Sequence, residues 1–475
     1  MHLRCATPLA LIAAAALTWA APPSLRAEPA STTPIPLPTT STVFVDPLKP
    51  ARYLDPRTPD ERTAGFNAAA DYSAERGGRA LLVMQGGKVI FQRYDNTWSA
   101  SRPHPLASGT KSFVGVLAVA AISDGLLTGF DERAADTLTE WQADPRKSKI
   151  TVRNLLQLNS GLEAADALLG GRGGSSVLGE GASRRNQRLD RERTGPAPRD
   201  LGLAALEVDA INEPGSVFRY GPSHFYAFGE LLKRKIAARK AADPAFPYTG
   251  VEDYLIKRIL TPAGVSVFRI GKDPSGNPNL PGGSMLTAEN WARFGRFVTL
   301  GGAVISDTGE PTQVLDPKLL AECFKPSPTN KQYGLTWWLG SGGEPELTVA
   351  ESGLTPADSP AATPADGKDE QRQTLRDRLR ERYREQLRER NQQGQTRAPT
   401  LPDGQTLELF MAAGLGKQRL YLLPQLDLVI VRFGEATRNS NQWDNAAFLS
   451  PIVGIETLTL APADAPPGKP AQSGQ

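Results

Sequence analysis

The chain of 475 residues is long enough for two or three average domains, or for one large domain with insertions. Charged residues make up 22% of it and the formal net charge is +3, so the composition indicates neither a nucleic-acid partner nor an acidic binding target. The apolar share of 40% is sufficient for a folded core.

Residues 1–27 have the pattern of a secretory signal peptide. Arg4 precedes an apolar stretch over residues 9–21, and small residues follow it. An uncleaved anchor is the alternative, although the stretch is short for a membrane span and no longer one occurs in the sequence. We therefore expect an exported bacterial protein, periplasmic or secreted, in which residues 28–60 form a linker rich in Pro, Ser and Thr.

The sequence has too few cysteines and histidines for an intrachain disulfide or a zinc site built from these residues. Cys5 lies in the predicted signal, which leaves Cys323 alone and predicts no intrachain disulfide. His2 is lost in the same way, and His104 and His224 cannot form a zinc cage, so we expect no metal and no cofactor. The sequence also lacks a Gly-x-Ser-x-Gly elbow and a phosphate-binding Gly-x-x-x-x-Gly-Lys-Ser/Thr loop. A hydrolase built on this chain must take its base from lysine or tyrosine.

The folded part is predicted to begin near Glu61, with a hairpin followed by a core helix. Residues 79–94 are two β-rich runs joined at Gly86-Gly87, which is the pattern of a tight hairpin. Ser108 then precedes a long apolar run that ends at Asp124-Gly125, and these are start and stop signals of a helix.

Ser108 and Lys111 are the candidate nucleophile and base. Side chains three residues apart share one face of a helix. Burial lowers the pKa of an amine, so a buried lysine can accept a proton near neutral pH, and the N–H groups at a helix start are suited to hold an oxyanion. The alternative is an ordinary N-cap serine followed by a surface lysine, which is the more common meaning of Ser-x-x-Lys taken alone.

The rest of the chain predicts further helices and three late strands. The helices are expected at 150–162, 251–260, 287–300 and 442–455, and the strands at 407–416, 418–424 and 427–433. Residues 355–399 interrupt this plan with an inserted linker around a charged helix, 369–390, which either rests on the surface or contacts a protein partner. The tail, 457–475, should be disordered.

Two later segments carry aromatic and polar candidates. Tyr220 lies in a Gly/Pro turn before a helix and is either functional or a packing residue, and His224 either lines a pocket or is a plain loop residue. Residues 333–338 resemble an exposed edge strand beside a cleft, although paired tryptophans are more often in a core.

Five segments together carry a resemblance to a known family. They are Leu106–Phe113, Ile150–Glu163, Phe218–Tyr220 with Gly229, Pro281–Thr287 and Tyr333–Trp338. Their types and order resemble the serine β-lactamase-like family, in the branch that holds class C β-lactamases, related esterases and 6-aminohexanoate-dimer hydrolases. The resemblance implies an α+β fold of the β-lactamase/transpeptidase type: an antiparallel sheet flanked by helices, plus a mostly helical subdomain over about 131–300. The hydrolase domain would comprise 61–354 and 400–456.

The resemblance also implies roles for individual residues. Ser108 looks like the acylated nucleophile, with Lys111 and Tyr220 as general base and acid. The backbone N–H groups of Ser108 and Leu415 would form the oxyanion hole. The residues expected to bind substrate are Pro222, His224, Trp337 and Gly414.

Departures from the family pattern bear on the substrate. Pro222 stands where the family carries an asparagine, and Ala412-Ala413 offer neither the cation nor the hydroxyl that binds a penicillin carboxylate. We therefore expect an exported serine esterase or amidase acting on a small molecule or short peptide. The alternatives are a β-lactamase, a D-Ala-D-Ala carboxypeptidase-type penicillin-binding protein, or a non-catalytic member that binds peptidoglycan or a partner.

Overall fold

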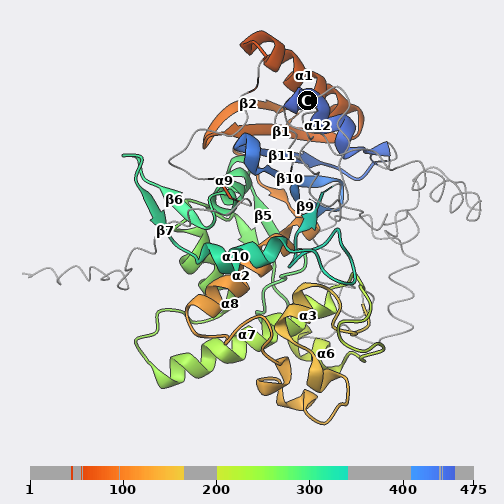
Figure 1. The fold of residues 1–475 in the computed structure, drawn as a ribbon, viewed down its shortest axis with the longest axis vertical. Coiled ribbons are helices and arrows are strands. Elements are labelled where there is room, and N and C mark those ends of the chain that lie inside the picture. Colours follow the sequence, from red (N-terminus) through yellow and green to blue (C-terminus); the bar gives the residue numbers. More distant parts are fainter. Residues whose placement is uncertain are drawn as a thin grey trace, which may run out of the picture. The chain divides into compact units, whose positions relative to one another are not determined.

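A six-stranded antiparallel sheet in the order β2-β1-β11-β10-β9-β8 joins early and late segments of the chain (Figure 1). Gly86 and Gly87, between β1 and β2, have φ of 59° and 80°, as a two-residue hairpin turn requires. The predicted hairpin and late strands are thus confirmed. The strands are β1 (Gly78–Gln85), β2 (Lys88–Tyr94), β8 (Trp338–Leu339), β9 (Phe410–Gly414), β10 (Gln418–Leu423) and β11 (Leu428–Gly434).

The computed structural model describes part of the chain: residues 44–45, 55, 57–95, 97–164, 200–340, 408–437, 440 and 442–454. All of them belong to one unit that begins at Leu37. The predicted signal peptide (1–27), the charged helix 369–390, the tail 457–475 and most of the predicted linker lie outside these ranges. None of the helices within them is both long and apolar enough to cross a membrane.

Helices cover both faces of the sheet. Because side chains alternate along a strand, neighbours on β10 point to opposite faces. Leu420 and Leu422 meet Gly295 of α9 (Ala288–Thr299), whereas the ring of Tyr421 lies 5.8 Å from that of Phe448 on α12 (Asn445–Val453). On the same face as α12, α1 (Pro59–Glu75) packs against both α12 and β1 (Figure 1).

A mostly helical part follows the core helix in the sequence. Among the helices of this part that the structure describes, α7 (Ser223–Ala242) packs against α3 (Val152–Leu156), α6 (Leu201–Glu207) and α8 (Val251–Leu255). A π-helical turn, Ile256–Leu260, continues α8. The prediction that this part reaches Leu300 is wrong, because α9 packs on β1, β10 and β11 and belongs to the sheet.

Short elements complete the described chain. β3 (His104–Pro105), β5 (Ser284–Leu286) and β4 (Arg269–Ile270) form a small sheet, and β6 (Ala303–Ile305) pairs with β7 (Pro311–Gln313). A short helix, α10 (Pro317–Ala321), follows.

The predicted helix over 150–162 is shorter than expected. Thr151 caps α3 in a capping box with Asn154, but the helix ends at Leu156. Leu158 adopts a left-handed conformation, φ 57°, which a continuing helix does not allow. Residues 159–162 therefore form a buried irregular segment.

The core helix, α2 (Ser112–Ser123), is buried on all sides over residues 112–121. It is preceded by a 3₁₀ turn, Ala107–Lys111, so the cap position falls on Leu106, and Ser108 does not act as an N-cap. Gly125, at φ 69°, follows the end of the helix as predicted.

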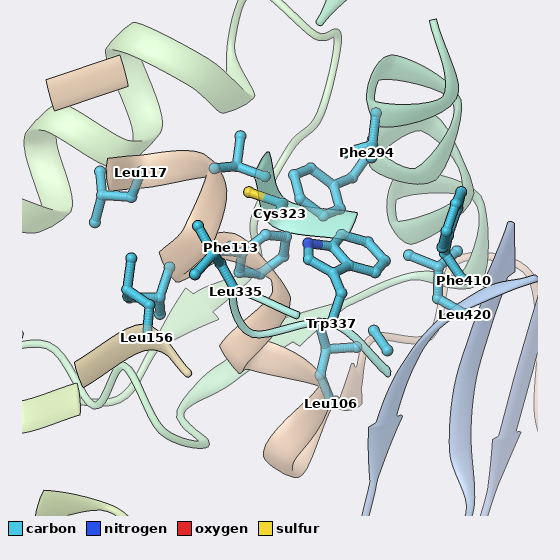
Figure 2. Close-up of a cluster of buried hydrophobic side chains, with 14 of the residues drawn as sticks. Leu106, Phe113, Leu117, Leu156, Phe294, Cys323, Leu335, Trp337, Phe410 and Leu420 are labelled. Carbon is cyan, nitrogen blue, oxygen red and sulfur yellow. The ribbon is translucent and has the colours of Figure 1, made fainter. Parts of the chain in front are cut away.

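The segment 333–338 is buried, so of the two alternatives the exposed strand is wrong and the core position of the tryptophans is confirmed. Trp337 is 0% exposed, and its ring lies 6.2 Å from that of Phe294 and 5.5 Å from that of Phe324. Figure 2 shows this indole among the apolar side chains around Phe113 of α2. Only Trp338 and Leu339 join the sheet, as its edge strand β8.

Candidate active site

The side chains of Ser108 and Lys111 meet at the start of the core helix. Lys111 Nζ lies 3.0 Å from Ser108 Oγ, within hydrogen-bond distance. Lys111 is 6% exposed although it is a lysine, and Ser108 is half-buried. The 3₁₀ turn places the two side chains on one side of the chain, because residues three apart eclipse each other in that conformation.

A glycine-rich loop holds the amine from the other side. Lys111 Nζ donates a hydrogen bond of 2.7 Å to the carbonyl oxygen of Pro281. Ser284, three residues on, donates from its N–H to Thr110 Oγ1 at 3.1 Å and accepts from the N–H of Leu106 at 2.9 Å. The loop is therefore attached to the turn that carries both Ser108 and Lys111.

Tyr220 completes the group. Its ring centroid lies 4.9 Å from Lys111 Nζ, and the ring stacks on Trp338 with 6.1 Å between centroids and 25° between planes. The ring of Phe225 lies 5.2 Å from the same nitrogen. The structure thus brings together all three residues that the sequence nominates for catalysis.

The end of strand β9 packs directly on the turn that contains Ser108. A Cβ on Gly414 would lie 2.1 Å from the carbonyl oxygen of Leu106 and 3.1 Å from the backbone nitrogen of Gly109. Leu415, next in the chain, begins the turn to β10, and its carbonyl accepts from Gln418 Nε2 at 2.9 Å. The peptide of Leu415 is therefore held beside the start of the core helix.

The backbone just before Ser108 is strained. Ala107 has φ 47°, in the left-handed region that costs a residue with a Cβ about 1 kcal/mol. Strain of this kind persists only where the surrounding structure enforces it, and it is concentrated at functional sites. Here the hydrogen bond from Leu106 to Ser284 and the contact with Gly414 enforce it from both sides.

His224 is placed differently from the prediction. It is completely buried, with Nδ1 2.9 Å from Ser160 Oγ and Nε2 2.9 Å from the carbonyl oxygen of Arg219. Burial lowers the pKa of His224 to about 4, and the nearby charges of Arg219 and Lys111 act in the same direction. A buried ring with both nitrogens engaged cannot line a substrate pocket, so the expected substrate contact is not supported.

Of the other residues expected to bind substrate, Pro222 and Gly414 lie near the site and Trp337 does not. Pro222 is half-buried at the N-cap of α7, two residues after Tyr220, and Gly414 lies against the Ser108 turn. Trp337 lies in the core, so of the tryptophan pair it is Trp338 that reaches the site, through Tyr220.

Two contacts of the site are absent from the sequence prediction. The carbonyl of Pro281 leaves no signal of its own in the sequence, because every residue has a carbonyl, although its Gly-Gly-Ser loop belongs to Pro281–Thr287, one of the five segments that carry the family resemblance. Phe225 reads as an ordinary apolar residue of α7. Among the residues that the structure describes, no group of three or more His, Cys, Asp or Glu is placed to hold a metal ion.

Comparison with known proteins gives a family and a fold. The Beta-lactamase family model matches residues 66–433, whereas no curated protein sequence matches the chain. Similar solved structures include a candidate 6-aminohexanoate-dimer hydrolase from Bacillus anthracis, 16% identical, with a TM-score of 0.51 and coverage of 81% of this chain and 79% of that one.

Two further structures are a D-stereospecific amidohydrolase from Streptomyces sp. and EstCE1, a hydrolase with promiscuous acyltransferase activity. The first is 13% identical, with a TM-score of 0.47 and coverage of 83% of this chain and 98% of that one. The second is 14% identical, with a TM-score of 0.48 and coverage of 84% and 98%. Because the family match spans well over half of its residues, this chain belongs to the beta-lactamase family of hydrolases and has the β-lactamase/transpeptidase fold.

Proposed function

We propose that the chain is an exported serine hydrolase that cleaves an ester or amide bond through an acyl-enzyme on Ser108. The main support is the distance of 3.0 Å between Lys111 Nζ and Ser108 Oγ in a buried setting closed by the ring of Tyr220. A hydroxyl with a base in hydrogen-bond reach, and a third group beside that base, is the arrangement of an activated nucleophile.

In the acylation step, the unprotonated amine of Lys111 takes the hydroxyl proton of Ser108 while Oγ bonds to the substrate carbonyl carbon. The carbonyl double bond opens to an oxyanion, which the N–H groups of Ser108 and Leu415 would stabilise by a few kcal/mol. When this intermediate collapses, the bond to the leaving alcohol or amine breaks. The leaving group receives the proton from Lys111 by way of the Tyr220 hydroxyl.

In the deacylation step, water attacks the acyl carbon and gives a proton to the same base. The bond between Ser108 Oγ and the acyl group breaks, Oγ recovers a proton, and a carboxylic acid leaves. Pre-positioned groups account for most of the rate gain in such a scheme, because little needs to move during the reaction.

The surroundings favour a substrate with an uncharged acyl group. Pro222 has no side-chain amide, and the buried residues Ala412 and Ala413 on β9 offer neither charge nor hydroxyl. The stacked pair of Tyr220 and Trp338 adds an aromatic wall. A carboxylate-bearing β-lactam would find no cation at the strand position where the family usually carries one.

A fluorophosphonate probe tests the proposal. We expect one phosphonyl adduct per chain, located on Ser108 by peptide mass spectrometry and lost in Ser108→Ala. Ser112→Ala is the matched control, since Ser112 is a buried serine at the start of α2, directly after the turn that carries Ser108, and its Oγ donates to the Gly109 carbonyl at 2.7 Å. Absence of an adduct with both fluorophosphonate and labelled penicillin would support the non-catalytic alternative, a binder of peptidoglycan or of a protein.

Substrate class and export need separate measurements. Turnover of short p-nitrophenyl esters and amides, with little or none of nitrocefin and of D-Ala-D-Ala peptides, would support the esterase or amidase. Export rests on the composition of residues 1–27 and would be tested by the N-terminal sequence of the protein recovered from the bacterial periplasm or medium. A full-length N-terminus in the cytoplasm would contradict it.

A further inference from the structure

His224 lies in the first turn of α7, and its two ring nitrogens have different partners. Nε2 faces the carbonyl oxygen of Arg219 at 2.9 Å. Because a carbonyl can only accept, Nε2 must carry a hydrogen, and in the neutral ring Nδ1 then accepts from the hydroxyl of Ser160, 2.9 Å away. The tautomer of the ring follows from these partners.

The backbone of Arg219 is held on both sides by one short segment. Its N–H donates to the carbonyl of Leu158 at 2.7 Å, and its C=O accepts from His224. Ser160, which orients the imidazole, also accepts from the N–H of Leu162 at 3.2 Å. Leu158 and Ser160 are both fully buried, so the segment provides a rigid support.

The residue that this support presents is Tyr220. Tyr220 directly follows the backbone carbonyl that His224 holds, and its phenol ring lies over Lys111 Nζ. Phe225, next to His224 on α7, places its own ring against the same nitrogen. Two consecutive residues of α7 therefore act on the amine of Lys111. His224 acts through the backbone before Tyr220, and Phe225 acts by direct contact.

We propose that His224 is a positioning residue for Tyr220: its hydrogen bond to the Arg219 carbonyl holds the Arg219–Tyr220 peptide unit so that the phenol ring stays beside Lys111 Nζ. This role rests on the proposed function, because it takes Tyr220 as the group that passes the proton to the leaving group. His224 itself does not touch substrate. A small displacement of a proton-transfer group costs a large part of the rate, so the bond matters for turnover more than for substrate binding.

The first test compares two amides at position 224. In His224→Gln the side-chain amide extends to about the position of Nε2 and keeps a donor for the Arg219 carbonyl. In His224→Asn the shorter amide reaches about the position of Nδ1 and loses that donor. We expect kcat on an ester substrate to fall about 10- to 100-fold in His224→Asn with KM changed less than about threefold, and to stay within about threefold in His224→Gln. Equal kcat in the two variants would overturn the proposal.

The second test is a double-mutant cycle with Tyr220→Phe. If His224 acts through the phenol, His224→Asn should lower kcat no further once Tyr220 has lost its hydroxyl. Independent, additive losses would mean that His224 only stabilises the fold, and would also overturn the proposal. His104→Asn is the matched control, because His104 is a buried histidine whose Nε2 faces a backbone carbonyl, that of Gly434, at 3.2 Å. It should lower the melting temperature while kcat stays within about twofold of wild type.

Fluorophosphonate labelling of the wild type distinguishes a failure of the proposed hydrolase function from a failure of the positioning role of His224. Labelling of Ser108 together with equal kcat in the two amide variants would leave the proposed function standing and refute the role of His224. No labelling of Ser108 by either fluorophosphonate or labelled penicillin would refute both. Labelling of Ser108 together with the expected difference between the amides would support both.

Discussion

The backbone of Gly414 touches the carbonyl oxygen of Leu106 so closely that a Cβ at position 414 would lie 2.1 Å from it. Real Cβ atoms do not approach an oxygen to that distance, so a side chain here must push β9 away from the turn that carries Ser108. The contact sets the spacing between the N–H groups of Ser108 and Leu415, on which oxyanion stabilisation depends in the proposed mechanism.

Gly414→Ala is therefore expected to lower kcat/KM by about 100-fold or more and to cost about 1–3 kcal/mol of unfolding free energy, as overpacking does. Enzyme kinetics and urea unfolding check this. Gly129→Ala is the matched control, because a Cβ on Gly129 meets no atom within 4 Å, and it should leave both quantities nearly unchanged. Normal activity of Gly414→Ala would remove Leu415 from the oxyanion hole.

Replacing the amine of Lys111 should reduce kcat by about 100-fold or more, as expected for the loss of a general base. Lys111→Arg should be no better, since a guanidinium does not give up its proton at any working pH. Lys147 offers the control: it is also buried, and its Nζ donates to a backbone carbonyl, that of Leu206, at 3.0 Å. Lys147→Ala should destabilise the fold without a comparable loss of kcat, and near-normal turnover of Lys111→Ala would transfer the base to another residue.

Asp124 connects the end of the core helix to the segment around α8, and its removal should cost about 2–3 kcal/mol of unfolding free energy. Its carboxylate accepts from the hydroxyl of Tyr254 at 2.7 Å and from Nε of Arg258 at 2.9 Å. Asp124→Ala would leave these partly buried donors without their acceptor. Glu435→Ala removes a more exposed partner, that of Arg79, and should cost less than about 1 kcal/mol in the same urea titration.

Acidification should destabilise the protein before its carboxylates titrate. Burial lowers the pKa of His104 and of His224 to about 4, against an ordinary value of 6.5. Because the unfolded state then takes up the protons first, stability is full above pH 6.5 and is lost as the pH falls toward 4. By pH 5 the loss should be about 2 kcal/mol for each histidine.

Urea unfolding at pH 7, 6 and 5 measures this loss. His104→Asn removes one of the two groups, so the decrease between pH 7 and pH 5 should be about half that of the wild type. A stability that stays constant over this interval would contradict the burial of both imidazoles.

The parts of this fold that the sequence predicts correctly are those with a local pattern. Gly86-Gly87 between two β-rich runs is sufficient for the hairpin, and Thr287 before an amphipathic run is sufficient for α9, which it caps through the N–H of Asn290. Ser108, Lys111 and Tyr220 were recognisable for another reason. Reactive residue types at a fixed spacing carry information even when the fold around them is unknown.

Features that depend on tertiary pairing were not predictable in this way. Trp337 and Trp338 are adjacent aromatic residues, and the sequence does not show which of them faces the core. That depends on the pairing of Trp338 with Met411, a residue of β9 that is far away in the sequence. Leu158 adopts a left-handed backbone conformation soon after the end of α3, and no glycine or proline at this point in the sequence predicts that the helix ends there. The sequence around His224 is typical of a polar loop, whereas the structure buries the side chain completely. Its burial depends on Ser160, which lies in the segment after α3 and is distant in the sequence.

The pairing of β1 with β11 has a consequence for how the molecule is made. Val83 lies opposite Ile430, so the centre of the sheet joins residues roughly 350 positions apart, a separation that slows folding. During synthesis one edge of the first hairpin stays unpaired until the residues of β11 have left the ribosome. A truncated product that stops before β11 would contain every nominated catalytic residue and yet lack the strand that completes the sheet behind them.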